Sequence, residues 1–145
     1  MAFKFKKLEV WQLALDYADP VYELADKLPD SEKFNLRSQI TRAATSIALN
    51  IAEGSTGQTD PEQARFLGLA IRSLIETIAC LRLIERRNYI TDPNLVNEID
   101  KQAEQLLARL QAFRNAIHPR QLHEVERTAY LSMKRSELRR QQAAE

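Results

Sequence analysis

The chain has 145 residues, of which 44% are hydrophobic and 28% charged, and its 21 basic and 20 acidic side chains give a net charge of +1. A chain of this size forms one domain that buries roughly two-thirds of its unfolded surface, so its core needs no disulfide or structural metal. The even charge balance excludes a global attraction to nucleic acid, so any such binding requires a local basic patch.

The N-terminus and the cysteine content favour the cytoplasm. The first residues, MAFKFKK, lack the apolar stretch of a secretory signal, and no apolar run approaches the roughly 20 residues needed to cross a bilayer. Cys80 is the single cysteine, which excludes an intramolecular disulfide and a thiolate metal cluster. We expect a cytoplasmic protein that does not span a membrane.

The first predicted helix ends at Leu28-Pro29, because a residue before proline is pushed out of the helical region. Pro20 lies inside it, where it removes a backbone donor and crowds the preceding turn, so we expect a kink or a break at Asp19. Apolar side chains recur at steps of three and four residues and predict a buried seam of Leu8, Trp11, Leu15, Ala18, Tyr22 and Ala25.

A second helix is predicted after Pro29. Asp30 or Ser31 should cap its start, and Gly54 should end it in a left-handed conformation. Its apolar side chains group on one face, which consists of Leu36, Ile40, Ile47 and Ile51.

Two further helices start at aspartate-proline pairs. Asp60 and Asp92 should each supply a capping side chain, with the following proline at the first helical position. The third helix runs to about Arg87 and has apolar positions Phe66, Leu67, Ala70, Leu74, Ile78, Leu81 and Ile84. The fourth stops at His118-Pro119 and repeats apolar residues at Val96, Ile99, Ala103, Leu106, Leu110, Phe113 and Ile117.

Four long helices joined by short loops pack most simply as an antiparallel up-down-up-down bundle. We therefore predict an all-α fold in which residues 1–118 form a four-helix bundle. Residues 119–145 should form a C-terminal extension that is helical and partly mobile.

The second predicted helix carries no charge from Ala43 to Ala52, where the sequence is AATSIALNIA. A helix that is apolar or small nearly all round is usually buried all round, and Leu49 falls almost opposite the apolar face. We therefore predict a homo-oligomer with this helix near the interface. The alternative is that the other three helices cover it within a monomer.

A polar stripe lies beside the apolar face of the same helix. Its members fall within roughly 80° of one another, and they are Gln39, Arg42, Ser46, Asn50 and Glu53. With Leu49 they form the predicted oligomer interface, where polar groups bonded across a subunit seam would fix its register. In the alternative interpretation, Arg42 and Asn50 contact a phosphate or a base.

The segment QITRAATSIALNIAEG, from Gln39 to Gly54, resembles the bacterial four-helix-bundle proteins encoded in intervening sequences of 23S ribosomal RNA genes. LEVWQLA, from Leu8 to Ala14, and Leu28-Pro29 add to the resemblance, which runs from Phe5 to Ile117. The matching positions are Trp11, Gln12, Pro29, Gln39, Arg42, Ser46, Asn50, Glu53, Gly54, Phe66, Ser73 and Glu76. Their role in the family is structural.

The resemblance implies a homopentameric barrel of four-helix bundles with no known enzymatic activity. The family is related to the accessory variability proteins of diversity-generating retroelements, which implies binding to a reverse transcriptase and to nucleic acid through a basic surface. This chain has Ala48 where many relatives have proline, and it extends beyond Pro119.

No catalytic, cofactor or metal site is predicted. His118 and His123 are badly spaced for a shared metal, and neither has a glutamate three residues before it, as helix-bundle metal sites require. Ser46, Ser73 and Cys80 have no histidine nearby in sequence. We expect no small-molecule substrate and no enzymatic activity.

Two basic clusters are the candidates for nucleic-acid contact. The first lies at the end of the third helix and consists of Arg82, Arg86 and Arg87. The second lies in the C-terminal extension and consists of Lys134, Arg135, Arg139 and Arg140. The leading hypothesis is therefore a non-catalytic oligomer that scaffolds an RNA or DNA complex, with or without a reverse transcriptase. The alternative is a protein-binding or structural module without nucleic-acid contact.

Overall fold

The computed structural model describes residues 3–57, 59–118 and 124–144, with side chains described from Leu131 onward in the last of these stretches. Those residues form helices and no strand. The helices are η1 (Lys4–Lys7), α1 (Glu9–Asp26), η2 (Asp30–Glu32), α2 (Leu36–Gly54), α3 (Asp60–Arg86), α4 (Pro93–Ile117) and α5 (Glu124–Ala143).

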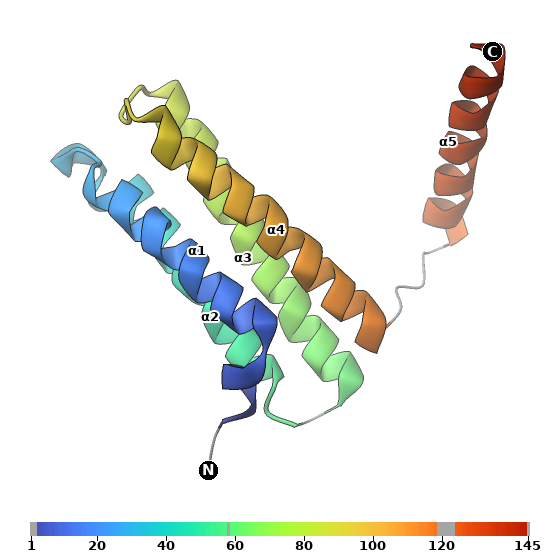
Figure 1. Ribbon diagram of the computed structural model, residues 1–145, viewed down its shortest axis with the longest axis horizontal. Helices are drawn as coiled ribbons and strands as arrows, with labels where there is room; N and C mark the ends of the chain where they lie inside the picture. The colour runs from blue at the N-terminus through green and yellow to red at the C-terminus, as the bar shows by residue number, and fades with distance from the viewer. Residues whose placement is uncertain (1–2, 58, 119–123, 145) are drawn as a thin grey trace.

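Helices α1 to α4 form an antiparallel four-helix bundle (Figure 1). Each helix packs against the next one along the chain, and α1 closes the bundle against α4. The all-α, up-down-up-down prediction is therefore confirmed. The largest fully buried side chains are Tyr17, Leu24, Ile40, Ile47, Ile51, Leu67, Leu74, Leu81, Ile84, Ile99, Leu106 and Leu110.

Helix α1 runs without interruption through Pro20, so the predicted break at Asp19 is wrong. Pro20 is buried, and the helix packs against both α2 and α4. Tertiary contacts of this kind offset the backbone hydrogen bond that a proline inside a helix removes. The helix ends at Asp26, two residues before Leu28, in agreement with the prediction that Leu28-Pro29 stops it.

The buried face of α1 also differs from the predicted seam. The core side chains of this helix are Val10, Ala14, Tyr17, Pro20, Val21, Leu24 and Ala25, and only Ala25 belongs to that seam. Leu15 and Tyr22 are exposed. Because α1 packs between α2 and α4, its buried arc is centred between these neighbours. Leu8 and Trp11 of the predicted seam are partly buried and pack against the core. Tyr22 lies toward α2, where its hydroxyl is hydrogen-bonded to the Thr45 hydroxyl.

Helix α2 starts later than predicted, and it ends at the predicted glycine but without the predicted left-handed conformation. Asp30 and Ser31 belong to η2, and the carboxylate of Glu32 accepts a hydrogen bond from the backbone N–H of Leu36 at 3.3 Å. Gly54 is the last residue of α2 and does not have a positive φ. A Cβ at Gly54 would lie 2.7 Å from the Cβ of Phe66, so the glycine permits the close approach of α2 and α3.

The starts of α3 and α4 are close to the prediction. Thr59, not Asp60, caps α3, since its hydroxyl accepts from the backbone N–H of Glu62 at 3.3 Å. Asp92 caps α4 as predicted, accepting from the backbone N–H of Asn94 at 3.0 Å.

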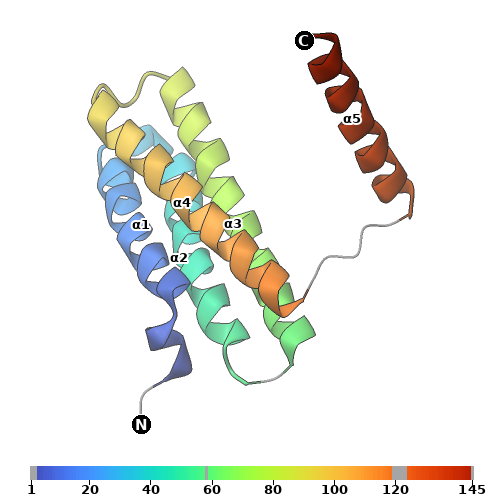
Figure 2. The same cartoon turned by 45° about the vertical axis from the view of Figure 1, so that its right-hand side comes forward.

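The C-terminal extension contains a helix, α5, as predicted. In the part of the chain that the structure describes, α5 packs against none of the other helices. It stands apart from the bundle in two views (Figures 1 and 2). Its exposed apolar side chains are Leu131, Met133 and Leu138, and no other helix of the described residues covers them.

Candidate functional site

A groove of about 490 Å³ runs along the outer face of α2. Its walls come mainly from α2, with one side chain from α1, and its lining consists of Tyr22, Ser38, Thr41, Arg42, Thr45, Ser46, Leu49, Asn50 and Glu53. The predicted interface residues therefore lie together, except Gln39, which is outside the lining and donates to the Asn35 side chain at 2.8 Å.

Several polar side chains of this groove have partners within the chain. The amide of Asn50 donates to the hydroxyl of Ser46 at 3.0 Å, and the hydroxyl of Ser73 on α3 also donates to Ser46 at 3.0 Å. Arg42 lies 3.8 Å from the carboxylate of Glu76, and both side chains are well exposed. The contacts of Ser73 and Glu76 join α3 to α2 and hold the polar side chains of the groove in place.

Leu49 is the apolar side chain of the groove that remains exposed to solvent. It is 54% exposed, in a groove wall that carries charge only at Arg42 and Glu53. The other helices of the bundle therefore do not cover α2 on all sides within one chain. An exposed leucine among small and hydroxylated side chains suits a protein contact better than a phosphate.

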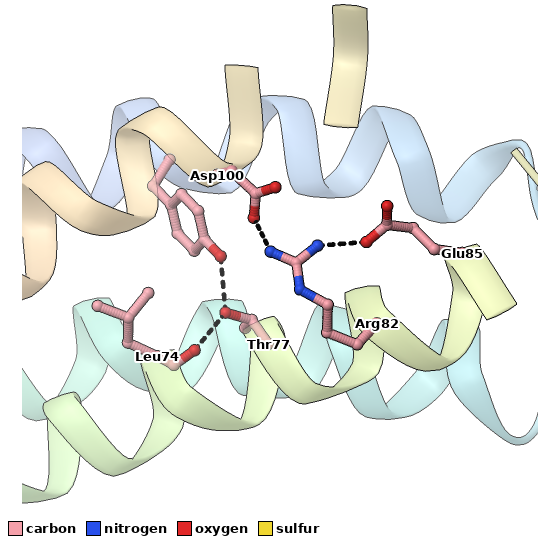
Figure 3. A network of polar contacts seen from close by, with 6 residues as sticks. Leu74, Thr77, Arg82, Glu85 and Asp100 are labelled. Carbon is pink, nitrogen blue, oxygen red and sulfur yellow. Dashed lines mark hydrogen bonds and ion pairs between the residues drawn. The ribbon is translucent and has the colours of Figure 1, made fainter. Parts of the chain in front are cut away.

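At the end of α3, Arg82 is ion-paired with Asp100 on α4 and with Glu85 (Figure 3). Hydrogen bonds to Asp100 first and Glu85 second raise the pKa of Arg82. Two carboxylates offset its charge, so Arg82 contributes little to a surface that attracts phosphate. Arg86 and Arg87 are exposed, and neither has a carboxylate partner within the described ranges.

Next to this ion pair, Tyr17 is hydrogen-bonded to Thr77 inside the core at 2.7 Å. The Thr77 hydroxyl donates to the carbonyl of Leu74 at 2.6 Å, so the Tyr17 hydroxyl must donate to Thr77. Burial raises the pKa of Tyr17 to about 12. The pair is a satisfied structural contact between α1 and α3.

The exposed face of α3 carries a row of arginines that was not predicted from the sequence. Arg65, Arg72 and Arg86 share this face because they are separated by multiples of seven residues, about two helical turns. Arg65 is paired with Glu62 at 2.8 Å, whereas Arg72 is exposed and has no carboxylate partner among the residues described. The seven-residue spacing was the signal that could have identified Arg72.

The basic residues of α5 form a separate group. Arg135, Arg139 and Arg140 are exposed, and Lys134 lies 3.4 Å from the carboxylate of Glu137. Helix α5 stands away from the end of α3 in both views (Figures 1 and 2). One copy of the chain therefore does not bring the two predicted basic clusters together.

The described residues contain no group of histidine, cysteine and acidic side chains that could hold a metal ion. Burial raises the pKa of the Cys80 thiol, which disfavours the reactive thiolate. His118 is exposed, and His123 lies outside the described residues. No helix in the described part of the chain is long and apolar enough to span a membrane.

These features define an all-helical bundle protein with a groove on α2 and exposed arginines on α3 and α5. A family model described as "23S rRNA-intervening sequence protein" matches residues 6–112. The chain belongs to that family, which confirms the resemblance.

A solved structure supports the assignment. The chain is similar to a protein of unknown function from the S23 ribosomal protein family of Bacteroides thetaiotaomicron VPI-5482, with 27% identity and a TM-score of 0.66. The match covers 72% of this chain and 97% of the other. No curated protein matches the sequence. Helix α5 lies beyond the residues that the family model matches.

Proposed function

We propose that the protein is a non-catalytic homo-oligomer, built from five copies, that binds RNA or DNA as a scaffold. The observation that carries the proposal is a set of exposed arginines. Arg72 and Arg86 lie on α3 and Arg87 directly follows it, and Arg135, Arg139 and Arg140 lie on α5. Arg72, Arg86 and Arg87 have no carboxylate partner in the described structure, so their charge is available to phosphates.

Repetition of these arginines in an oligomer strengthens the attraction of the surface for nucleic acid. The whole chain has a net charge of only +1, so a single copy exerts little long-range attraction. Each copy that joins a ring adds another set of the same arginines. Their summed field attracts a polyanion more strongly than one set does. The name of the family, which refers to an intervening sequence of 23S rRNA, supports a link to RNA without defining a ligand.

A gel-shift experiment on the full-length chain tests this proposal. At about 50 mM salt, generic RNA and DNA should be shifted, and R72A/R86A/R87A should bind more weakly and depend less steeply on salt. The control K27A/K101A/R109A removes three exposed cations elsewhere and should bind like the unmodified protein.

One observation favours a second candidate function. Ile75 and Leu83 are exposed on α3 near the arginine row, as expected where a protein partner docks. If the unmodified protein shifts neither RNA nor DNA at about 50 mM salt, the nucleic-acid proposal is wrong. A protein-binding or structural module is then the better description, and a reverse transcriptase is one partner to test.

A further inference from the structure

Helix α5 presents an apolar row that the described part of its own chain leaves exposed. Leu131 is 43% exposed and Leu138 is 56% exposed. They are seven residues apart and so lie on one face of the helix. Lys134 and Arg135 border this row on its two sides at 100° per residue, and Arg139 lies next to Arg135. Residues 131–143 contain four basic side chains and one acidic, a net charge of +3.

Helix α1 presents a matching row of the opposite charge. Leu15 is 40% exposed and Tyr22 is 42% exposed, and they are also seven residues apart. Asp19 and Asp26 lie within roughly 60° of this row around the helix. No basic residue occurs in α1, and its net charge is −5, from Glu9, Asp16, Asp19, Glu23 and Asp26.

We propose that α5 of one copy packs on this exposed face of α1 in a second copy. Equal seven-residue spacing lets the two apolar rows meet along parallel or antiparallel helices. The arginines of α5 then lie beside the carboxylates of α1. This surface adjoins the groove of α2, where the copies meet in the proposed function, because Tyr22 also lines that groove. It gives the C-terminal extension a role.

The geometry favours a second copy over the same chain. Helix α5 follows α4 in sequence, and α4 approaches α1 at Glu9, whose carboxylate lies 3.4 Å from Arg109. Glu9 lies roughly 140° around α1 from Tyr22. Tyr22 borders α2, where its hydroxyl meets Thr45. To reach the row, the α5 of the same chain would have to cross α1, whereas the α5 of another copy can approach it from solvent.

Disulfide crosslinking between two differently tagged full-length copies tests the proposal. One copy carries Leu15→Cys, and the other carries Leu131→Cys or Leu138→Cys, which distinguishes parallel from antiparallel packing. A crosslinked pair of unlike copies should form, and copies with only one added cysteine control for the buried natural thiol of Cys80.

Charge reversal makes the test specific. D19K/D26K in the Leu15→Cys copy should lower the crosslinking yield at least about tenfold, because like charges then face each other. Adding R135E/R139E to the other copy should restore the yield. All four positions are exposed, so these changes leave the core intact, and circular dichroism verifies the fold.

Three outcomes would overturn the proposal. They are no crosslink above the single-cysteine controls, a yield that charge reversal does not change, and a crosslink that forms only inside one chain carrying both cysteines. Leu49→Glu disrupts the groove of α2 and leaves α1 and α5 unchanged, so the crosslink should persist in that variant. Failure of this proposal and failure of the proposed α2 interface are therefore distinguishable.

Discussion

Tyr17 shows at the residue scale how the bundle tolerates a polar group in its core. Its hydroxyl donates to Thr77, which in turn donates to a backbone carbonyl, so neither side chain lacks a partner. The contact joins α1 to α3, two helices that do not otherwise pack closely in the described structure. Such a pair helps to fix which face of α1 is buried.

The raised pKa of Tyr17 predicts alkaline destabilisation. The unfolded chain loses the phenol proton near pH 10, whereas the folded protein keeps it until about pH 12. The contribution is therefore fully present below about pH 10 and is lost as the pH rises toward 12, by roughly 3 kcal/mol. Urea unfolding at about pH 9 and about pH 11 should show a smaller loss for Tyr17→Phe than for the unmodified protein.

The variant provides its own control at neutral pH. There Tyr17→Phe should reduce the free energy of unfolding by about 1 kcal/mol, because Thr77 loses the donor of its hydrogen bond. Equal losses of stability in both proteins between the two pH values would show that Tyr17 does not titrate as described.

Arg82 illustrates why the charge of a site is harder to predict than its position. The sequence places it beside Arg86 and Arg87, and the basic cluster was predicted on that ground. Its main partner, Asp100, comes from another helix, 18 residues away. Only the packing of α3 on α4 shows that this charge is neutralised.

At the scale of the element, the α2–α3 contact depends on Gly54. Gly54→Ala should destabilise the protein by roughly 1–3 kcal/mol, since the new methyl group would overlap Phe66 and force the helices apart. Gly68→Ala on α3 is the matched control. Its Cβ would lie 3.5 Å from Arg114, an ordinary contact, and replacing a helical glycine should stabilise by up to about 1 kcal/mol.

Thermal and urea unfolding of both glycine variants would measure this contrast. If Gly54→Ala were as stable as Gly68→Ala, the close approach at Phe66 would not explain the glycine. The sequence suggested a different reason for Gly54, a left-handed helix end, because local patterns do not reveal a neighbouring helix.

The other elements differ in how far the sequence predicts them. Helices α3 and α4 each have one continuous apolar stripe, and most of their predicted core residues are buried. The exceptions are only partly buried, and they are Phe66, Ile78, Phe113 and Ile117. Helix α1 has two apolar stripes at similar spacing. Which of them is buried depends on the directions from which α2 and α4 approach, and no pattern within α1 contains that information. The cap of α3 was displaced by one residue because Thr59 and Asp60 are both good caps.

For the whole molecule, the groove of α2 is the proposed contact between copies in a ring. Leu49→Glu places a charge on its exposed apolar wall. The variant should lower the mass of the assembly at micromolar concentration without unfolding the bundle, as multi-angle light scattering and circular dichroism would show. Thr56→Glu, at an exposed site outside the groove lining, is the control and should leave the mass unchanged.

A monomeric mass for the unmodified protein would contradict the interface on α2. The sequence predicted this surface because charge is missing from Ala43 to Ala52, a signal that a single helix carries by itself. It could not locate the α1 surface that we propose for α5. That surface is defined by what the rest of the bundle leaves uncovered.

The separation of α5 from the bundle has a consequence for its hydrogen exchange. An isolated helix of this length is only marginally stable in water, because most helical stability in proteins comes from packing of an apolar face. The backbone amides of α5 should therefore exchange quickly in dilute solution and more slowly as the protein concentration rises and a second copy covers Leu131 and Leu138. The exchange rate of α5 would therefore measure the fraction of copies in which this helix is covered by a second copy.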